Sequence, residues 1–290
     1  MSIKLIVTDL DGTFLNSNHV TIPQENIKAF RKAHEMGVKV AVASGRTKIL
    51  ADNVTEQLPF LDYLITSNGA VTYDMKTGET VCSTLLDNHQ SVEIFDILKD
   101  YNLIYEIYFK GDCYMNEKSY SMFDTEHVSP HIHDLLKDFI KPVPSLSDFI
   151  GDEGIEKLNI LSLTGEERIE IEEKIRKTGD VAFASSFPIV KGKNGNLEMT
   201  GMNATKGFAV KGIADALGID KENIMCFGDG ENDCSMLEFA EYSFAMANGT
   251  DLVKSTAKYV TDTNDNAGVA KAVEKYVFNK SGEWFMNINK

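Results

Sequence analysis

The chain has 290 residues, which at roughly 150 residues per domain predicts two domains. Its hydrophobic share of 43% and its charged share of 25% are ordinary for a soluble globular protein with packed cores. The net charge of −15 argues against nucleic acid and anionic membranes as partners, because both bind basic surface.

The chain opens with an apolar strand that runs straight into two aspartates, in the sequence I-K-L-I-V-T-D-L-D-G-T at 3–13. Its β-prone residues are too closely spaced for an alternating strand, so we expect burial on both faces, as in a parallel sheet. Asp9 falls at the carboxyl end of this strand, where open α/β sheets bind ligands. On these residues alone, an ordinary acidic turn at Asp11-Gly12 is an equally good interpretation.

Neither a signal peptide nor a membrane span is expected. The N-terminus enters the strand without a basic stretch, an apolar segment and a cleavage site, and no apolar run approaches the length that spans a bilayer. The four cysteines form no C-x-x-C pair, which fits free thiols. We therefore expect a cytoplasmic protein.

After the first strand, helices and strands alternate as in a doubly wound sheet. The expected elements up to residue 84 are a helix at 24–36, a strand ending in Ser44-Gly45-Arg46, a helix at 48–58 and a strand at 63–73 with a turn at Asn68-Gly69. The fold class predicted for this part is α/β, with a parallel sheet.

The pattern changes between residues 85 and 190. An alternating strand pair joined at Lys110-Gly111-Asp112 has the signature of an antiparallel hairpin. The other expected elements are helices at 87–101, 122–139 and 166–177, strands at 157–163 and 181–185, and a proline-containing loop at 141–145. We interpret this segment as an inserted α+β domain with an antiparallel sheet.

The strand and helix alternation resumes at Asn196, which predicts a discontinuous core domain at 1–84 and 191–290 around the inserted domain at 85–190. Apolar residues at helical spacing predict an amphipathic helix immediately after Lys206. The remaining expected elements are strands at 223–229 and 243–247 and helices at 235–241 and 268–278. The tail at 281–290 holds the only tryptophan and is either an edge strand or a docking segment.

Three strands end in polar clusters: the two early aspartates, Ser44-Gly45-Arg46, and G-D-G-E-N-D at 228–233. In a parallel sheet these ends lie side by side, and matched carboxylates on two strands are less expected by chance than any single cluster. A site with Asp9, Asp229 and Asp233 within reach is all oxygen, which suits a hard cation such as Mg²⁺ and not zinc or copper. Such a cation would offset the repulsion between the carboxylates and the charge of an incoming phosphate.

The set D-L-D-G-T, S-G-R, Lys206 and G-D-G-E-N-D-C-S-M resembles the four motifs of the haloacid dehalogenase-like (HAD) hydrolases. It is closest to the Cof-type subgroup, subfamily IIB, whose α+β cap is inserted between the second and third motifs. S-N-G-A at 67–70 and the pairing of M-A-N-G with T-N-D-N-A-G-V-A are similar to the same subgroup, although its members more often read M-G-N-A. The resemblance covers nearly the full chain. It implies a Rossmann-like core with a cap domain, and a phosphatase that uses Mg²⁺.

Phosphate ester hydrolysis is easier in two steps, in which a carboxylate attacks phosphorus and water then hydrolyses the acyl phosphate. The resemblance implies that Asp9 is this nucleophile. Asp11 would act as general acid on the leaving group and then as general base on the water, and the first role requires a raised pKa. The family places Mg²⁺ on Asp9, Asp229 and the backbone carbonyl of Asp11.

Fixed donors aimed at the equatorial oxygens of a transferring phosphoryl group supply most of the rate enhancement. By correspondence with the family, Ser44, the Gly45 amide and Lys206 take this role, and Asn232 is a further phosphate-binding or supporting donor. Asp233 would orient the metal-bound waters or the lysine. The structural alternative for Lys206 is a solvated surface charge at the start of a helix.

Other polar residues carry weaker functional interpretations. Arg46 and Glu231 remain outside the predicted site. A metal site at His127, His131 and His133 is not favoured, because the spacing matches no helix-based ligand pair with a third ligand. The tyrosines of the inserted domain either face substrate or, as we favour, pack its sheet, and they are Tyr101, Tyr105, Tyr108 and Tyr114.

We therefore expect a Mg²⁺-dependent phosphatase that hydrolyses a small phosphorylated metabolite, a sugar phosphate or a phosphorylated cofactor precursor, through an aspartyl-phosphate intermediate. The cap would exclude water and select the substrate. A phosphosugar mutase of the same superfamily would return the phosphoryl group to the sugar instead of to water. A third interpretation is a regulatory module that binds phosphate without turnover. Nothing in the sequence specifies an oligomeric state.

Overall fold

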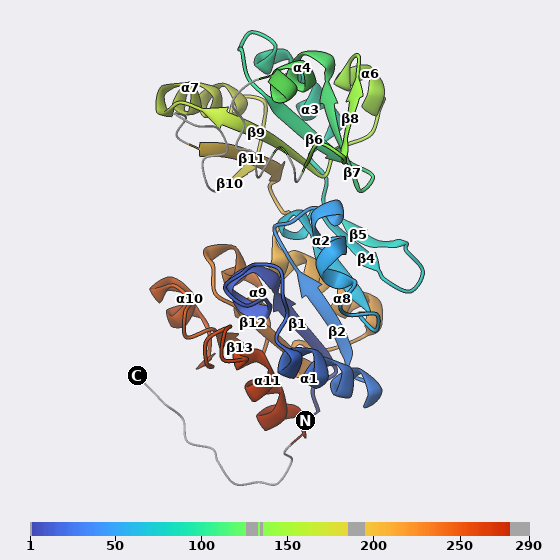
Figure 1. The fold of residues 1–290 in the computed structure, drawn as a ribbon, viewed down its shortest axis with the longest axis vertical. Coiled ribbons are helices and arrows are strands. Elements are labelled where there is room, and N and C mark those ends of the chain that lie inside the picture. Colours follow the sequence, from blue (N-terminus) through green and yellow to red (C-terminus); the bar gives the residue numbers. More distant parts are fainter. Residues whose placement is uncertain (1, 126–132, 134–135, 185–194, 279–290) are drawn as a thin grey trace. The chain divides into compact units, whose positions relative to one another are not determined.

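The computed structural model describes residues 2–125, 133, 136–184 and 195–278. The chain divides into two compact units (Figure 1). The first comprises Met1–Arg46, Leu50–Ser83 and Thr205–Lys290, and the second comprises Thr47–Ile49 and Thr84–Ala204. The first unit is therefore built from early and late segments of the chain, which are blue and orange to red in Figure 1.

The first unit contains an eight-stranded sheet in the order β14-β13-β12-β1-β2-β3-β4-β5. Its strands are β1 (Leu5–Asp9), β2 (Lys39–Ala43), β3 (Tyr63–Thr66), β4 (Val71–Asp74), β5 (Thr80–Ser83), β12 (Ile224–Gly228), β13 (Tyr242–Ala245) and β14 (Tyr259–Val260). All pairs from β14 to β3 are parallel, which confirms the doubly wound parallel sheet. The strand with a turn expected at 63–73 is the antiparallel pair β3 and β4, and β5 adds an antiparallel edge that the sequence did not predict.

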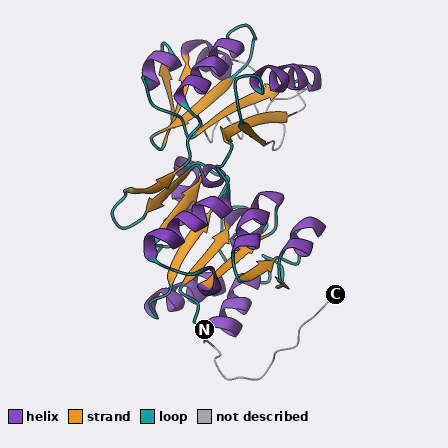
Figure 2. Cartoon of the chain, turned by 180° about the vertical axis from the view of Figure 1, so that it is seen from behind, coloured by secondary structure: helices purple, strands orange, loops and turns teal. Residues whose placement is uncertain are grey.

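Helices lie on both sides of this sheet (Figure 2). One hydrophobic cluster includes α1 (Gln24–Glu35), α2 (Lys48–Thr55), α11 (Gly268–Val273) and the π-helix η5 (Glu274–Phe278), and the other includes α8 (Lys206–Leu217), α9 (Cys234–Phe239) and α10 (Asp251–Thr256). Successive residues of β1 contribute to opposite clusters: Ile6 packs in the first, and Leu5 and Val7 pack in the second. Burial of this strand on both faces, as its apolar spacing predicted, is confirmed.

The second unit contains a six-stranded sheet in the order β10-β11-β9-β6-β7-β8, antiparallel except between β7 and β8. Its strands are β6 (Tyr105–Phe109), β7 (Asp112–Asn116), β8 (Ile140–Val143), β9 (Lys157–Leu163), β10 (Val181–Ala184) and β11 (Gly195–Gly201). The helices among its described residues are α3 (Asn88–Leu98), α4 (Glu117–Thr125), α6 (Leu146–Ile150) and α7 (Gly165–Ile175). Residues of α3, α6 and α7 bury one face of the sheet in a single apolar cluster.

Two strands of the second unit differ from the sequence-based expectation. β11 was expected in the core, but it pairs with β9 and β10, and its Leu197 and Met199 are buried in the apolar cluster of the second unit. The second unit therefore extends to Ala204 instead of ending at 190. The segment expected as a loop forms β8, where Pro142 is tolerated because an edge strand needs no outward donor.

The hairpin turn is as predicted. Lys110 and Gly111 both have left-handed backbones, with φ of 52° and 83°, which a two-residue turn between antiparallel strands requires. The tyrosines around it do not share one face: Tyr105 is buried in the apolar cluster, whereas Tyr108 donates its hydroxyl to Glu106 at 2.8 Å. The packing role that we favoured fits the burial of Tyr105 and Tyr108, whereas Tyr101 and Tyr114 are only partly buried.

Several predicted features lie outside the described residues, namely His127, His131, half of the helix expected at 122–139 and the tryptophan of the tail. The ring of His133 stacks on Phe123, with 5.1 Å between the ring centroids. Within the described part of the chain, no helix has the length and apolar character needed to cross a bilayer. All four cysteines are free thiols.

Candidate active site

Three neighbouring strands bring the predicted site residues to one edge of the first sheet. β12, β1 and β2 lie side by side and run parallel, and Asp9 ends β1 opposite Ala43 at the end of β2. Ser44 directly follows β2, and Asp229 directly follows β12. The carboxyl ends of these strands thus gather residues from the beginning and the end of the chain, as the sequence predicted.

Lys206 lies at the first position of α8, and its side chain is completely buried. Its Nζ donates to Oδ1 of Asp9 at 2.5 Å and to Oδ1 of Asp233 at 2.6 Å. Burial acts to lower the pKa of Lys206, but the charges of Asp233 and Asp9 raise it above its ordinary value. The ammonium therefore stays charged, and a solvated surface lysine is excluded.

Three carboxylates, those of Asp9, Asp229 and Asp233, each place one oxygen within 4.8 Å of the other two. Burial raises the pKa of Asp9 well above its ordinary value, and the neighbouring carboxylates add to this effect while Lys206 opposes it. Burial also raises the pKa of Asp229 to about 6. Because a divalent cation would relieve this repulsion and the donors are all oxygen, the cluster fits Mg²⁺.

The three carboxylates are not equivalent. Both oxygens of Asp233 accept from protein donors, Oδ1 from Lys206 and Oδ2 from the backbone amides of residues 229 and 230 at 2.9 Å each. Asp229 accepts the hydroxyl of Thr13 through Oδ1 at 2.7 Å. Among the described residues, no hydrogen bond engages Oδ2 of Asp9 or Oδ2 of Asp229. These two oxygens are therefore the ones available to a ligand.

The loop after β1 packs closely on Asp229, and this contact requires Gly12. Gly12 has φ of 79°, and a Cβ there would lie 2.2 Å from Oδ2 of Asp229. Asn248 donates to the Gly12 carbonyl at 2.7 Å and accepts from the Asn264 amide at 3.0 Å, and the Asn264 side chain donates to the Leu15 carbonyl at 2.9 Å. The segments M-A-N-G and T-N-D-N, paired in the sequence, thus hold this loop in place.

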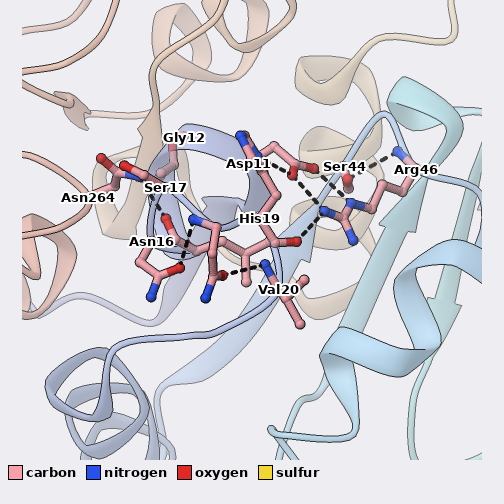
Figure 3. Close-up of polar contacts among 12 residues, drawn as sticks. Asp11, Gly12, Asn16, Ser17, His19, Val20, Ser44, Arg46 and Asn264 are labelled. Carbon is pink, nitrogen blue, oxygen red and sulfur yellow. Dashed lines mark hydrogen bonds and ion pairs between the residues drawn. The ribbon is translucent and has the colours of Figure 1, made fainter. Parts of the chain in front are cut away.

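Asp11 forms a two-pronged ion pair with Arg46 (Figure 3). Arg46 donates from Nε to Oδ2 at 2.8 Å and from Nη2 to Oδ1 at 2.6 Å, and it also donates to the His19 carbonyl at 2.8 Å. Burial acts to raise the pKa of Asp11, but the hydrogen bonds and charge of Arg46 lower it below its ordinary value. This ion pair therefore holds Asp11 in its ionised form. The general-acid role needs the opposite, a raised pKa.

The remaining predicted phosphate-binding residues meet around Asn68. Ser44 is buried, and its Oγ accepts from the amide of Arg46 at 3.0 Å. Asn232 is exposed in the short helix η4 (Glu231–Asp233), and its Nδ2 donates to Oδ1 of Asn68 at 2.9 Å. A Cβ on Gly45 would lie 3.0 Å from the same Asn68 oxygen.

Four side chains that contact the predicted site were missed in the sequence. Arg46 and Thr13 lie inside the S-G-R and D-L-D-G-T motifs, so their position in those motifs could have included them. Asn68 lies in the S-N-G-A segment, whose similarity to the subgroup could have included it, whereas His19 lies in a loop and only the folded chain brings its Nδ1 within 3.1 Å of Oδ1 of Asp11.

The family model and two relatives that match this chain are described as hydrolases or phosphatases. A family model described as haloacid dehalogenase-like hydrolase matches residues 6–273. The chain is 30% identical to 5-amino-6-(5-phospho-D-ribitylamino)uracil phosphatase YcsE of Bacillus subtilis, over 96% of this chain and 97% of the relative. It is 32% identical to phosphatase YwpJ of the same organism, over 92% of this chain and 97% of the relative.

The fold is also similar to that of a solved structure from the same family. A crystal structure of a haloacid dehalogenase-like hydrolase from Bacteroides thetaiotaomicron matches with a TM-score of 0.79 and 25% identity, over 94% of this chain and 99% of that one. The resemblance carried by the four motifs is confirmed by the family match. The chain belongs to the haloacid dehalogenase-like hydrolases, and it is an enzyme that hydrolyses phosphoric monoesters.

Proposed function

We propose that this enzyme is a Mg²⁺-dependent phosphatase that transfers the phosphoryl group of a small organic phosphate to Asp9 and then to water. The observation that carries the proposal is the Asp9 carboxylate at the end of β1, with one oxygen bound by the buried Lys206 and the other without a hydrogen bond among the described residues. Such a carboxylate is fixed in orientation and has one oxygen available to attack phosphorus.

Mg²⁺ would be held by the carboxylates of Asp9 and Asp229, where Oδ2 of Asp229 accepts no hydrogen bond among the described residues, together with the Asp11 backbone that the family implies. When bound, the ion would neutralise charge on the carboxylates and on the phosphoryl oxygens. Asp233 keeps both of its oxygens on Lys206 and on backbone amides. It would therefore orient the lysine instead of binding the ion directly.

The phosphoryl oxygens would be bound by Ser44, the Gly45 amide, Lys206 and Asn232, which surround the end of the first sheet. Lys206 is charged and buried, so its field at the phosphoryl group is not screened by water. Ser44, the Gly45 amide and Lys206 are fixed before the reaction, so they would stabilise the charge that develops on the equatorial oxygens without reorganising, whereas Asn232 would hold the phosphate group.

Asp11 would give a proton to the leaving oxygen, and it would then take a proton from the water that attacks the phosphorus of the Asp9 phosphate. Its carboxylate is paired with Arg46 here, and the ion pair favours the ionised form. The ionised form serves the second step directly. The first step requires Asp11 to leave Arg46 and take up a proton.

The second unit is proposed to be the cap domain that selects the leaving group. The core domain is proposed at 1–84 and 191–290, except that β11 pairs with β9 and so belongs to the cap, which moves the second boundary to Thr205. The substrate class that we propose is a sugar phosphate or a phosphorylated cofactor precursor. The relative named for a phosphoribitylaminouracil supports this class, because that compound combines a sugar-alcohol phosphate with a heterocycle. Free thiols at all four cysteines support the proposed cytoplasmic location.

Turnover of p-nitrophenyl phosphate with Mg²⁺ tests this function. Asp9→Asn should abolish turnover, because an amide is not a nucleophile at phosphorus, while the circular dichroism spectrum stays that of the wild type. Asp215→Asn makes the same chemical change on an exposed residue of α8 and should retain full activity. Excess EDTA should silence the wild type. Turnover by Asp9→Asn, or activity that survives EDTA, would contradict the proposal.

A further inference from the structure

The loop between β3 and β4 has an unusual backbone for its sequence. Ser67 and Asn68 are consecutive non-glycine residues with φ of 50° and 59°, and Gly69 follows with φ of 111°. A left-handed backbone costs a non-glycine residue about 1 kcal/mol or more, and asparagine tolerates it better than most. The Ser67 hydroxyl is buried and has no hydrogen-bond partner among the described residues, which adds a further cost.

The loop contacts each of the segments that carry the proposed phosphate donors. The Ser67 amide donates to the Arg46 carbonyl at 2.9 Å, and the Asn68 amide donates to the Ser44 carbonyl at 3.0 Å. Gly69 lies so close to Thr205, the N-cap of α8, that a Cβ on it would be 2.3 Å from the Thr205 carbonyl oxygen. The backbone of the loop therefore fixes the S-G-R segment and the start of the helix that opens with the buried lysine.

The Asn68 side chain makes the remaining contact. Its Oδ1 accepts from Nδ2 of Asn232 at 2.9 Å and lies 3.0 Å from where a Cβ on Gly45 would be. Asn232 is exposed, and this is the one side-chain hydrogen bond that the described residues give it. An exposed side chain samples several rotamers, and holding it in one costs about 0.5 to 1.5 kcal/mol at the moment of binding. Asn68 removes this cost by fixing Asn232 beforehand.

We propose that Asn68 is a positioning residue for phosphate binding, which anchors Asn232 beside Gly45 so that the donors on three segments keep one spacing. This inference rests on the proposed function, because it takes Asn232 as a phosphate donor. Asn68 tolerates the left-handed backbone and supplies the acceptor oxygen, and glycine would satisfy only the first requirement. The two requirements can therefore be separated by substitution.

Asn68→Gly keeps the backbone conformation and removes the acceptor. We expect its thermal midpoint to stay within a few degrees of the wild type, while KM for p-nitrophenyl phosphate and the inhibition constant of inorganic phosphate each rise about tenfold, as for loss of one hydrogen bond to a charged group. The turnover number should change by less than about threefold, because the donor binds substrate and transition state alike. Lys110→Gly relieves a left-handed residue in the hairpin of the second unit and should leave both constants unchanged.

The double variant tests whether Asn68 acts through Asn232. Asn232→Ala alone should raise the inhibition constant of phosphate by a similar factor. The double variant with Asn68→Gly should have an inhibition constant no higher than the higher of the two single variants, since both substitutions remove the same donor. Unchanged constants in Asn68→Gly would overturn the inference, and so would effects that multiply in the double variant. Asp9→Asn, assayed in parallel, reports on the proposed function alone: its inactivity together with an unchanged Asn68→Gly overturns only the role of Asn68.

Discussion

Asp229 provides a quantitative test of the metal site, because the ionised form of its carboxyl group is destabilised when no cation is bound. Burial, with Asp233 beside it, raises its pKa from an ordinary 3.8 to about 6, against the hydrogen bond from Thr13. A carboxyl group whose pKa rises on folding stabilises the folded state fully below its unfolded pKa, and this contribution is lost as pH rises through the folded pKa. At about 1.4 kcal/mol per pKa unit, ionised Asp229 costs the metal-free protein about 3 kcal/mol at neutral pH.

Asp229→Asn removes that cost and can keep the Thr13 hydrogen bond through its amide oxygen. In EDTA at pH 7.5 we expect the variant to have a higher free energy of unfolding than the wild type, by up to about 3 kcal/mol, with the gain disappearing toward pH 4. Urea unfolding at several pH values measures this, with the exposed Asp215→Asn as control. Mg²⁺ should stabilise the wild type more than the variant. A variant less stable than the wild type at pH 7.5, or a gain independent of pH, would refute the reasoning.

Three further substitutions test separate parts of the site. Lys206→Met leaves two buried carboxylates without their cation, so it should lower the free energy of unfolding by about 3 to 5 kcal/mol in urea and abolish turnover; a stable variant would argue against a charged pair. Gly12→Ala places a methyl group against Asp229 in a left-handed backbone, so turnover should fall sharply in the phosphatase assay, and wild-type activity would show that the loop can move away. Arg46→Ala should raise the pKa of Asp11, so the limb of the kcat/KM profile that depends on Asp11 should move to higher pH; an unchanged profile would contradict the pairing.

The position of the site could be predicted because it depends on strand ends. The closely spaced apolar residues before Asp9 indicated a strand buried on both faces, and parallel pairing then placed the ends of β1, β2 and β12 together. The burial of Lys206 was not predictable from its place at a helix start. It depends on two carboxylates that lie far away in sequence and come within reach only in the folded sheet.

Where the sequence misled, the deciding information was the identity of a neighbouring strand. β11 was placed in the core because it begins the strand and helix alternation that continues to the end of the chain, and only its pairing with β9 and β10 assigns it to the second unit. The prolines at 141–145 predicted a loop, but the edge position of β8 tolerates Pro142. In the same way, the pairing of Asp11 with Arg46 comes from the orientation of two side chains on adjacent strand ends, which no spacing encodes.

The most direct test of the account is a search for phosphate on Asp9 itself. p-Nitrophenolate leaves with little help from an acid, so Asp11→Asn should still undergo the first step, whereas hydrolysis of the acyl phosphate, which needs Asp11 as base, should be slow. Rapid quenching of this variant with p-nitrophenyl phosphate and Mg²⁺, followed by peptide mass spectrometry, should show a phosphoryl adduct on Asp9. Adduct on another residue, or none during continued release of p-nitrophenol, would contradict the nucleophilic role of Asp9.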